Sequence, residues 1–318
     1  MASLTHCFEV FKTSTSHGAR SLRMKYVKQM DSSIKQHANY LDFCWCLERA
    51  RVAEGASSDE HASFRDFLDQ TQYKDSGVLA YEWIFGYGFI SPGGAAKNLE
   101  FLKLLQLKPS DVMLDVGCGI GGSLHQAVEN YGCRVLGVDL SSNMLNVALE
   151  RLQAKPDDRI RYMLADVMTH DLGAGQFDVI YSRDCIQHIA DLQTLYARFH
   201  KWLKPGGRLL TTSYTAGSGE FSEKFKAYLK QRQYGLKPIG EYEKACKSAG
   251  FSHVECTDMT HKFREILLAE INHANTNKTA FLEKFSAKEF DGLLEGWQNK
   301  IGYIDARNHC WSMVYCTK

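Results

Sequence analysis

Residues 111–123 read D-V-M-L-D-V-G-C-G-I-G-G-S, and residues 133–139 read C-R-V-L-G-V-D. The apolar run at 112–116 is typical of a buried strand, and a cluster of glycines follows it directly. A segment of helical character then extends to about residue 131, and the second apolar run ends on Asp139. Strand, glycine-rich turn, helix, strand and acid in this order predict the first βαβ unit of a nucleotide-binding sheet.

The glycines and the two acids of this stretch indicate which nucleotide is bound. Gly117, Gly119 and Gly122 satisfy the spacing G-x-G-x-x-G, which lets a ligand approach the backbone closely but does not separate NAD from S-adenosylmethionine (SAM). Asp139 is placed to accept hydrogen bonds from two ribose hydroxyls. Asp115 lies where the pyrophosphate of NAD would need room without negative charge, whereas SAM carries an ammonium and a sulfonium that an acid can favour. We therefore predict SAM; a glycine-rich turn without a ligand and an NAD-dependent dehydrogenase are the alternatives.

Composition limits the class of protein. The chain has 318 residues, of which 44% are hydrophobic and 24% are charged, and its net charge is +1. This balance argues against a nucleic-acid partner. No apolar run approaches the roughly 18 residues of a membrane span, and the N-terminus lacks the pattern of a secretory signal. The ten cysteines are scattered without a C-x-x-C pair and the histidines without metal-ligand spacing. We expect reduced thiols, no metal and a cytoplasmic location.

The chain divides into an N-terminal part and one larger domain. Residues 1–64 have helical character and are predicted to be an extension or remnant, and residues 65–318 a methyltransferase domain. Residues 65–94 are rich in aromatics and end in S-P-G-G. They are interpreted either as a lid over the cofactor cleft or as a helix that packs its aromatics on the core.

Strand and helix patterns alternate through the rest of the domain. Further strands are expected at 159–164, 177–181, 208–215, 253–257 and 311–316, and helices at 95–107, 141–152, 191–204 and 241–249. Residues 220–234 are predicted to form a helical insertion that binds substrate. The pattern fits an α/β fold of the class I SAM-methyltransferase type, Rossmann-like, with a seven-stranded mixed sheet. Ligands bind beyond the carboxyl ends of such strands, so residues 165–167 and 182–188 are expected at the site.

Several longer motifs carry a resemblance to a known family. They are Q-Y-K-D-S-G-V-L-A-Y-E-W-I-F-G-Y-G-F-I-S-P-G-G (72–94), L-D-V-G-C-G-I-G-G (114–122), Y-S-R-D-C-I-Q-H-I (181–189), Y-L-K-Q-R-Q-Y (228–234) and G-W-Q-N-K-I (296–301). Together they closely resemble the phosphoethanolamine N-methyltransferases of nematodes and apicomplexan parasites, over residues 70–318. The resemblance implies SAM-dependent N-methylation of phosphobases, ending at phosphocholine, with a small molecule as the only partner bound at the site.

The resemblance also implies roles for individual residues. Tyr73 and His188 match a Tyr–His pair linked to catalysis. The cofactor positions are Ile90, Ser91, Asp115, Gly117, Gly119, Asp139, Leu140, Asp166, Val167 and Arg183. The acceptor positions are Gln72, Tyr73, Tyr81, Asp184, Tyr214, Tyr228, Arg232, Tyr234 and Lys300.

The extent of the chain departs from the family pattern. Nematode members often carry two methyltransferase-like halves, whereas this chain has one complete domain that looks like the C-terminal half. That half is associated with methylation of phosphomonomethyl- and phosphodimethylethanolamine. We therefore expect these two acceptors, and a monomer that acts alongside a separate first-step methyltransferase.

The chemistry of the named residues is compatible with this interpretation. The acceptor amine has a pKa on the order of 10 and must lose its proton before it can attack a methyl group. His188 is interpreted as a general base, as a lock for the lid, or as a histidine satisfied by the backbone. Asp184 can attract the substrate ammonium or cap a helix, and Arg232 and Lys300 can hold a phosphate or lie on the surface. A methyltransferase for another small polar acceptor and a non-catalytic SAM-binding regulatory domain remain alternative functions.

Overall fold

The computed structural model describes residues 64–72 and 75–318. All of these residues lie within one compact unit of the chain. Of the predicted extension at 1–64, only residue 64 is among the described residues, and Tyr73 is not among them. The domain division therefore stays a prediction.

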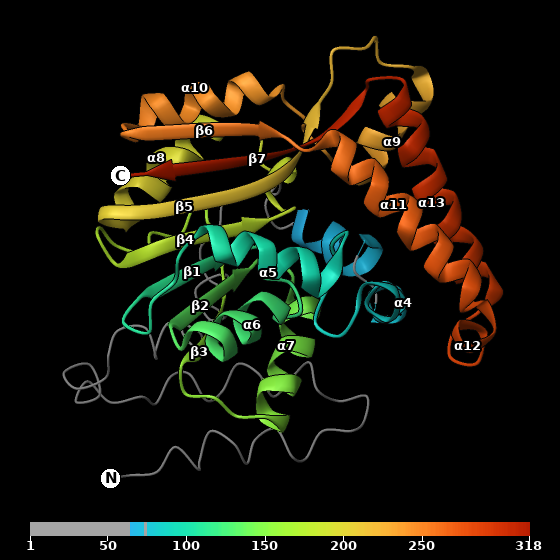
Figure 1. Cartoon of the computed structure of the whole chain (residues 1–318), viewed down its shortest axis with the longest axis horizontal. Helices are drawn as coiled ribbons and strands as arrows, with labels where there is room; N and C mark the ends of the chain where they lie inside the picture. Colours follow the sequence, from blue (N-terminus) through green and yellow to red (C-terminus); the bar gives the residue numbers. More distant parts are fainter. Residues whose placement is uncertain (1–63, 73–74) are drawn as a thin grey trace. The chain divides into compact units, whose positions relative to one another are not determined.

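A seven-stranded sheet with the order β3-β2-β1-β4-β5-β7-β6 forms the centre of the described unit (Figure 1). Neighbouring strands are parallel from β3 to β5, whereas β7 runs antiparallel to both β5 and β6. The strands are β1 (Val112–Val116), β2 (Arg134–Asp139), β3 (Ile160–Leu164), β4 (Phe177–Arg183), β5 (Leu203–Ala216), β6 (His253–Asp258) and β7 (His309–Thr317). The predicted mixed sheet is confirmed, and each predicted strand lies within one of the observed strands to within a residue at each end.

The helices connect and cover the strands. They are α4 (Asp75–Phe85), α5 (Gly94–Leu104), α6 (Gly122–Tyr131), α7 (Ser142–Ala154), α8 (Leu192–Trp202), α9 (Glu223–Arg232), α10 (Ile239–Ala249), α11 (Thr260–Thr276), α12 (Lys278–Leu282) and α13 (Ala287–Asp305), with short turns η5 (Leu68–Gln72) and η6 (Ile186–His188). The crossovers through α6 and α7 lead toward one edge of the sheet and the crossover through α8 toward the other. Right-handed connections therefore place α8 on the face of the sheet opposite to α6 and α7. The carboxyl ends of β1, β2 and β4 consequently meet at the point where the strand order reverses.

Two predicted helix ends are wrong. The helix predicted at 95–107 ends at Leu104. Helix α8 ends at Trp202 rather than at residue 204, and β5 begins at Leu203. Leu203 pairs with Phe177, but Arg208 pairs with Val179, so Lys204–Gly207 form an irregularity inside the strand. The chain terminus stabilises it, because Lys318 accepts from the Gly206 N–H and donates to the Gly207 carbonyl. The Pro-Gly-Gly sequence thus marks a strand irregularity as well as the end of a helix.

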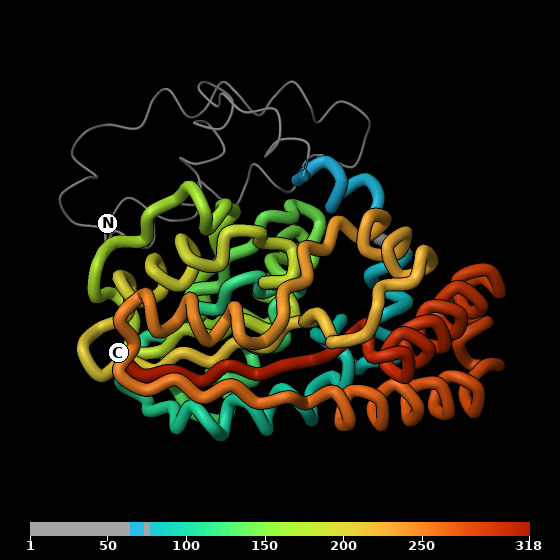
Figure 2. Tube along the Cα trace, turned by 90° about the horizontal axis from the view of Figure 1, so that it is seen from above, coloured from blue at the N-terminus to red at the C-terminus, as the bar shows by residue number. Residues whose placement is uncertain are grey.

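The aromatic segment before α5 packs on a group of helices at one end of the sheet. Trp83 of α4 meets Phe281 edge-on at 5.3 Å, and Phe85 meets Trp297 at 6.0 Å. Figures 1 and 2 show α11 and α13 side by side, extending beyond β6 and β7. Among the described residues, no helix is both long and apolar enough to span a lipid bilayer.

Candidate active site

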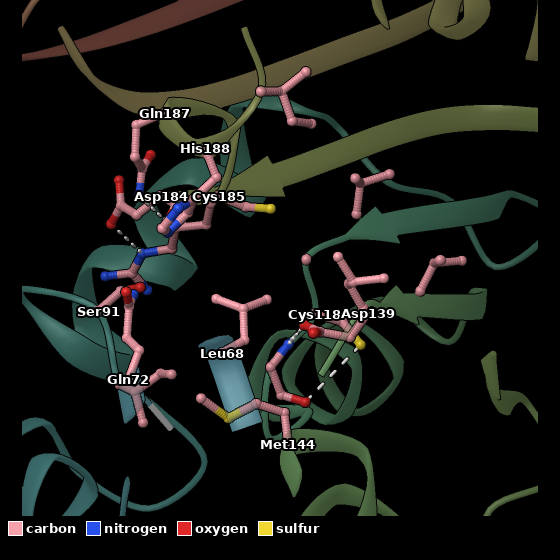
Figure 3. A pocket seen from close by; sticks show the side chains of 18 of the residues that line it. Leu68, Gln72, Ser91, Cys118, Asp139, Met144, Asp184, Cys185, Gln187 and His188 are labelled. Atoms are coloured by element: carbon pink, nitrogen blue, oxygen red, sulfur yellow. Dashed lines mark hydrogen bonds and ion pairs between the residues drawn. The ribbon is translucent and has the colours of Figure 1, made fainter. Parts of the chain in front are cut away.

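A cavity of about 660 Å³ lies beyond the carboxyl ends of β1, β2 and β4. Every described residue that was predicted for the site lines it, except Tyr228. Figure 3 shows Asp184, Gln187 and His188 on one side of the cavity and Cys118, Asp139 and Met144 on the other. We call these sides the acceptor half and the cofactor half, after the ligands predicted for them.

Asp139 ends β2 and organises the glycine-rich turn. Its two carboxylate oxygens accept the backbone N–H groups of Gly119 and Ser141, each at 2.8 Å. Burial raises the pKa of Asp139 to about 6, although these backbone donors oppose the shift. A carboxylate oxygen can accept more than one hydrogen bond, so the side chain still has acceptor capacity for ribose hydroxyls.

Asp115 is a buried acid, and one of its carboxylate oxygens makes no hydrogen bond among the described residues. Its side chain is 1% exposed, and its Oδ2 atom has no hydrogen-bond partner among the described residues. Burial, and then the neighbouring Asp139, raise the pKa of Asp115 to about 8. A buried carboxylate in this state is suited to a cationic ligand, which would restore its charge.

The glycines of the turn serve two different purposes. Gly117 adopts a φ of 72°, and a Cβ atom there would lie 2.3 Å from the Sγ atom of Cys185. Gly117 is thus required by packing within the chain. A Cβ on Gly119 would meet only Ile90, at 3.8 Å, so this glycine borders open space. The close-approach argument from the sequence therefore applies to Gly119 more directly than to Gly117.

Arg183 holds the turn that precedes α5. Its guanidinium donates to the carbonyl oxygens of Pro92 at 2.6 Å and Gly94 at 2.9 Å. Ile90 and Ser91, which were predicted to contact the cofactor, line the cavity at the start of this turn. Arg183 therefore has a clear positioning role, and direct contact with the cofactor stays a prediction.

Asp184 begins the acceptor half in an uncommon backbone conformation. Its φ is 52°, in the left-handed region, where aspartate is tolerated better than most residues. Its Oδ1 atom accepts from Thr212 Oγ1 at 2.9 Å and from Trp311 Nε1 at 2.7 Å. The Oδ2 atom is buried without a hydrogen-bond partner among the described residues. The alternative role of Asp184 as a helix cap is not observed, because the side chain bonds to β5 and β7 instead.

Two cations and three tyrosines complete the acceptor half. Arg232 at the end of α9 and Lys300 of α13 line the cavity with Tyr81, Tyr214 and Tyr234. Lys300 Nζ lies 3.5 Å from the Tyr214 hydroxyl and 5.1 Å from the centre of its ring. Burial and the nearby Arg232 lower the pKa of Lys300 to about 8. The alternative, in which these cations lie on the surface, is wrong.

His188 lies at the end of η6, among aromatic rings. Its ring centre is 4.8 Å from that of Tyr234 and 5.5 Å from that of Phe64. Both ring nitrogens are buried and lack a hydrogen-bond partner among the described residues. Burial, together with the charge of Arg232, lowers the pKa of His188 to about 4. The backbone of Gln233 opposes this shift in pKa, so the interpretation as a backbone-satisfied histidine stays open. The imidazole is neutral near pH 7 in either case.

Two predicted residues remain apart from this arrangement. Tyr73 lies outside the described residues, so its pairing with His188 stays a prediction. Tyr228 does not line the cavity. Its ring packs behind Tyr234 at 5.8 Å and against Tyr303 at 5.2 Å. Helical spacing alone could not distinguish a cavity-facing tyrosine from one a turn away.

Sequence reasoning missed residues that hold the site together. Asp69 of η5 accepts from the hydroxyls of Ser141 and Ser142, each at 2.6 Å, at the N-terminus of α7. Segment 64–72 is thereby attached to the turn that follows Asp139, which fits the predicted lid as well as the packing role. Glu270 of α11 accepts the Gly93 N–H at 2.7 Å. A single acid on a polar helix carries no distinguishing sequence signal. No cluster of metal-ligating side chains occurs in the described ranges.

Comparisons with known proteins show which proteins the chain resembles. The family model of a methyltransferase domain matches residues 114–211. The chain is 43% identical to phosphoethanolamine N-methyltransferase 2 of Caenorhabditis elegans, over 100% of the chain and 73% of that protein. It is 36% identical to the phosphoethanolamine N-methyltransferase of Plasmodium falciparum, over 80% of the chain and 97% of that protein.

A solved structure of similar sequence comes from Haemonchus contortus. It is phosphoethanolamine N-methyltransferase 2 in complex with phosphomonomethylethanolamine and S-adenosylhomocysteine (SAH). It is 48% identical to this chain with a TM-score of 0.79, and the match covers 80% of this chain and 60% of that one. The chain also spans only 55% of its maize relative, phosphoethanolamine N-methyltransferase 1, so several relatives are considerably longer.

Proposed function

The chain belongs to the phosphoethanolamine N-methyltransferase family, and we propose that it transfers methyl groups from SAM to phosphoethanolamine derivatives, forming phosphocholine. The observation that carries the proposal is the presence of both cationic and anionic side chains in one cavity. Arg232 and Lys300 supply two cations, and Asp184 supplies a carboxylate. A phosphobase carries a phosphate dianion at one end and an amine at the other, so its two ends match these groups.

The cofactor half fits SAM. Asp115 offers a buried carboxylate oxygen without a hydrogen-bond partner to an α-ammonium, and Asp139 offers acceptor atoms to ribose hydroxyls. The open side of Gly119 leaves room beside them. When bound, SAM supplies an electrophilic methyl group on its sulfonium. The contacts assigned to Leu140, Asp166 and Val167, which line the same cavity, are part of this proposal.

The protein's contribution to the reaction is orientation and removal of a proton. Arg232 and Lys300 anchor the phosphate, so the amine is held toward Asp184 and the cofactor half. Burial of the amine disfavours its charged form. His188 is neutral and can accept a proton or a hydrogen bond. Its low pKa, however, makes it a weak base for an amine, which favours the positioning role over direct proton transfer.

Variants of His188 distinguish these two roles. If His188 positions the lid or the amine through a hydrogen bond, His188→Asn retains much of kcat, because its amide can still accept and donate. If His188 is a general base, His188→Asn loses about 100-fold or more in kcat. We expect the first result, and steady-state kinetics with saturating SAM measure it. The matched control is His170, on the loop after β3 and outside the cavity.

The substrate range is tested with labelled SAM and three acceptors: phosphoethanolamine and its mono- and dimethyl forms. We expect turnover of the two methylated acceptors, in agreement with the acceptor bound by the Haemonchus relative. Turnover of all three would make the protein a complete phosphocholine synthase. If none is methylated while SAM still binds, the acceptor assignment fails and a methyltransferase of another polar acceptor takes its place.

The proposal also covers the oligomeric state, the partner enzyme and the location of the protein. A monomeric state, a separate first-step methyltransferase and a cytoplasmic location stay predictions. Sedimentation of the full chain tests the first of them. A stable dimer would contradict it.

A further inference from the structure

Glu82 of α4 is a buried acid whose two carboxylate oxygens have different partners. The residue is 9% exposed. Its Oε1 atom accepts the N–H of Gly88, in the turn after α4, at 2.6 Å. Its Oε2 atom accepts from Nη2 of Arg151 in α7 at 2.5 Å. One side chain therefore connects α4, the turn that follows it, and a helix of the cofactor half.

Arg151 extends this connection to the glycine-rich turn. Its Nη1 atom donates to the carbonyl oxygen of Ile120 at 3.4 Å. Its guanidinium carbon lies 4.6 Å from the centre of the Tyr87 ring, and that ring is 74% exposed. The side chain of Arg151 itself is only 13% exposed. Tyr87 therefore covers the ion pair on its outer side, which strengthens the pair because less water surrounds it.

Two glycines bring the aromatic segment into direct contact with the glycine-rich turn. The Gly88 carbonyl accepts the N–H of Gly122, the first residue of α6, at 3.1 Å. A Cβ atom on Gly88 would lie 2.8 Å from the Gly122 Cα atom, and a Cβ atom on Gly122 would lie 2.3 Å from the Gly88 oxygen. The last glycine of the G-x-G-x-x-G spacing is thus required by the packing of the aromatic segment.

The connected residues border both halves of the cavity. Ile120 and Gly122 of the glycine-rich turn line it, and so does Tyr81, the neighbour of Glu82 in α4. Glu82 and Arg151 do not line the cavity, so they act through these neighbours and not on a ligand. The contact between α4 and the turn therefore helps to fix how the acceptor half lies relative to the cofactor half.

We propose that Glu82 is a positioning residue, which together with Arg151 clamps the aromatic segment on the glycine-rich turn and so aligns the acceptor amine with the methyl group of SAM. The inference rests on the proposed function for the identity of the acceptor. A displacement of about 1 Å between reacting groups can cost about 100-fold in rate. The clamp should therefore control kcat, while each half of the cavity keeps its own affinity.

Glu82→Gln tests the clamp, because the amide can still accept the Gly88 N–H but carries no charge for Arg151. We expect kcat for phosphomonomethylethanolamine at saturating SAM to fall about 10-fold. The acceptor Michaelis constant and the SAH affinity should each change by less than about threefold. Steady-state kinetics and calorimetry on the full chain measure these quantities. A wild-type kcat in Glu82→Gln overturns the proposal, as does a loss confined to SAH affinity.

A double variant separates positioning from stability. Removing one partner of a buried ion pair leaves the other charge unpaired, so Glu82→Gln and Arg151→Met should each lower Tm. The double variant removes both charges and should recover most of Tm, whereas its kcat should stay about 10-fold below that of the wild type. Recovery of kcat together with Tm would show a merely structural role and overturn the proposal.

The matched control is an exposed ion pair between neighbouring elements. Glu129 of α6 pairs with Lys155, the residue after α7, and their side chains are 53% and 76% exposed. Exposed pairs of this kind contribute little to stability. Glu129→Gln and Lys155→Met should therefore leave kcat and Tm as in the wild type. A loss of kcat in these controls equal to that in Glu82→Gln would remove the special role of the buried pair.

Hydrogen exchange tests the clamp without any acceptor. Arg151 does not bond to Gly88, but it holds the carboxylate that accepts the Gly88 N–H. In the free full chain, exchange at Gly88 should therefore be at least about fivefold faster in Arg151→Met than in the wild type, as fragmentation mass spectrometry measures. An unchanged rate overturns the clamp. Faster exchange, in a protein whose wild type methylates none of the three acceptors, supports the clamp and removes only the acceptor assignment.

Discussion

The cofactor half and the acceptor half of the cavity are built in different ways. In the cofactor half, Asp139 ends β2 and Asp115 is the last residue but one of the adjacent parallel strand β1, and backbone N–H groups hold the carboxylate of Asp139. In the acceptor half, Tyr81, Arg232 and Lys300 come from three separate helices, and Tyr214 comes from a strand. The difference teaches that the cofactor site depends on the sheet itself, whereas the acceptor site depends on how distant helices pack. Substitutions in the acceptor half should therefore alter the affinity for the acceptor without affecting the affinity for the cofactor.

The largest effect on ligand binding is expected for a substitution in the cofactor half. Asp115→Asn should weaken SAH binding about 100-fold, because the ammonium loses its buried counter-charge. The wild-type affinity should rise from pH 6.5 to 8.5, since the acid, with its pKa of about 8, must lose a proton to pair with the ammonium. Calorimetry measures both effects.

The pH dependence supplies the control for Asp115. It should be absent in Asp115→Asn and retained in Glu150→Gln, a change at an exposed position of α7. Wild-type affinity that does not vary with pH would show that Asp115 is not the group that pairs with the ligand.

Arg232→Ala tests the independence of the acceptor half. The Michaelis constant for phosphomonomethylethanolamine should rise about 10- to 100-fold, because charged hydrogen bonds to the phosphate are lost. SAH affinity should remain nearly unchanged. Lys230→Ala, on the exposed side of the same helix, is the control. Equal loss of acceptor and SAH binding would remove the distinction between the halves.

Asp69→Ala examines the attachment of segment 64–72 to the cofactor half. The carboxylate bonds to Ser141 and Ser142, so its removal should increase the rate of SAH release about fivefold. Stopped-flow displacement measures the rate. Asp66→Ala, at an exposed position of the same segment, should behave as the wild type. An unchanged release rate in Asp69→Ala would mean that this segment does not limit exit of the ligand.

The smallest effect is expected for Tyr228→Phe, which should change the acceptor Michaelis constant by no more than about twofold. Its ring lies behind Tyr234 and does not line the cavity. Tyr234→Phe removes a hydroxyl from a cavity-lining ring and should raise the constant about fivefold. The same acceptor titration compares both variants. A larger effect for Tyr228 than for Tyr234 would reverse the observed order of the two rings.

The sequence predicted much of the sheet because the signals for a strand lie within a few neighbouring residues. The runs at 112–116 and 134–139 have the apolar pattern and glycine spacing that backbone geometry requires, and both were placed correctly. The start of β5 was missed because it depends on residues far apart in sequence. Leu203 pairs with Phe177, and Lys318 bonds to the Pro-Gly-Gly irregularity. The helices that line the acceptor half could be expected from periodicity, but not the direction of each side chain.

Residues 111–139 alone specify a βαβ unit with acids at its strand ends, because strand and turn preferences act over a few neighbouring residues. Motif resemblance adds the family, which the comparisons confirm. Only the tertiary structure places Asp69 at the start of α7 and Glu270 at the Gly93 turn. Burial and electrostatic interaction depend on distance in space, so an ordinary acid on a helix acquires its role only when the helices pack.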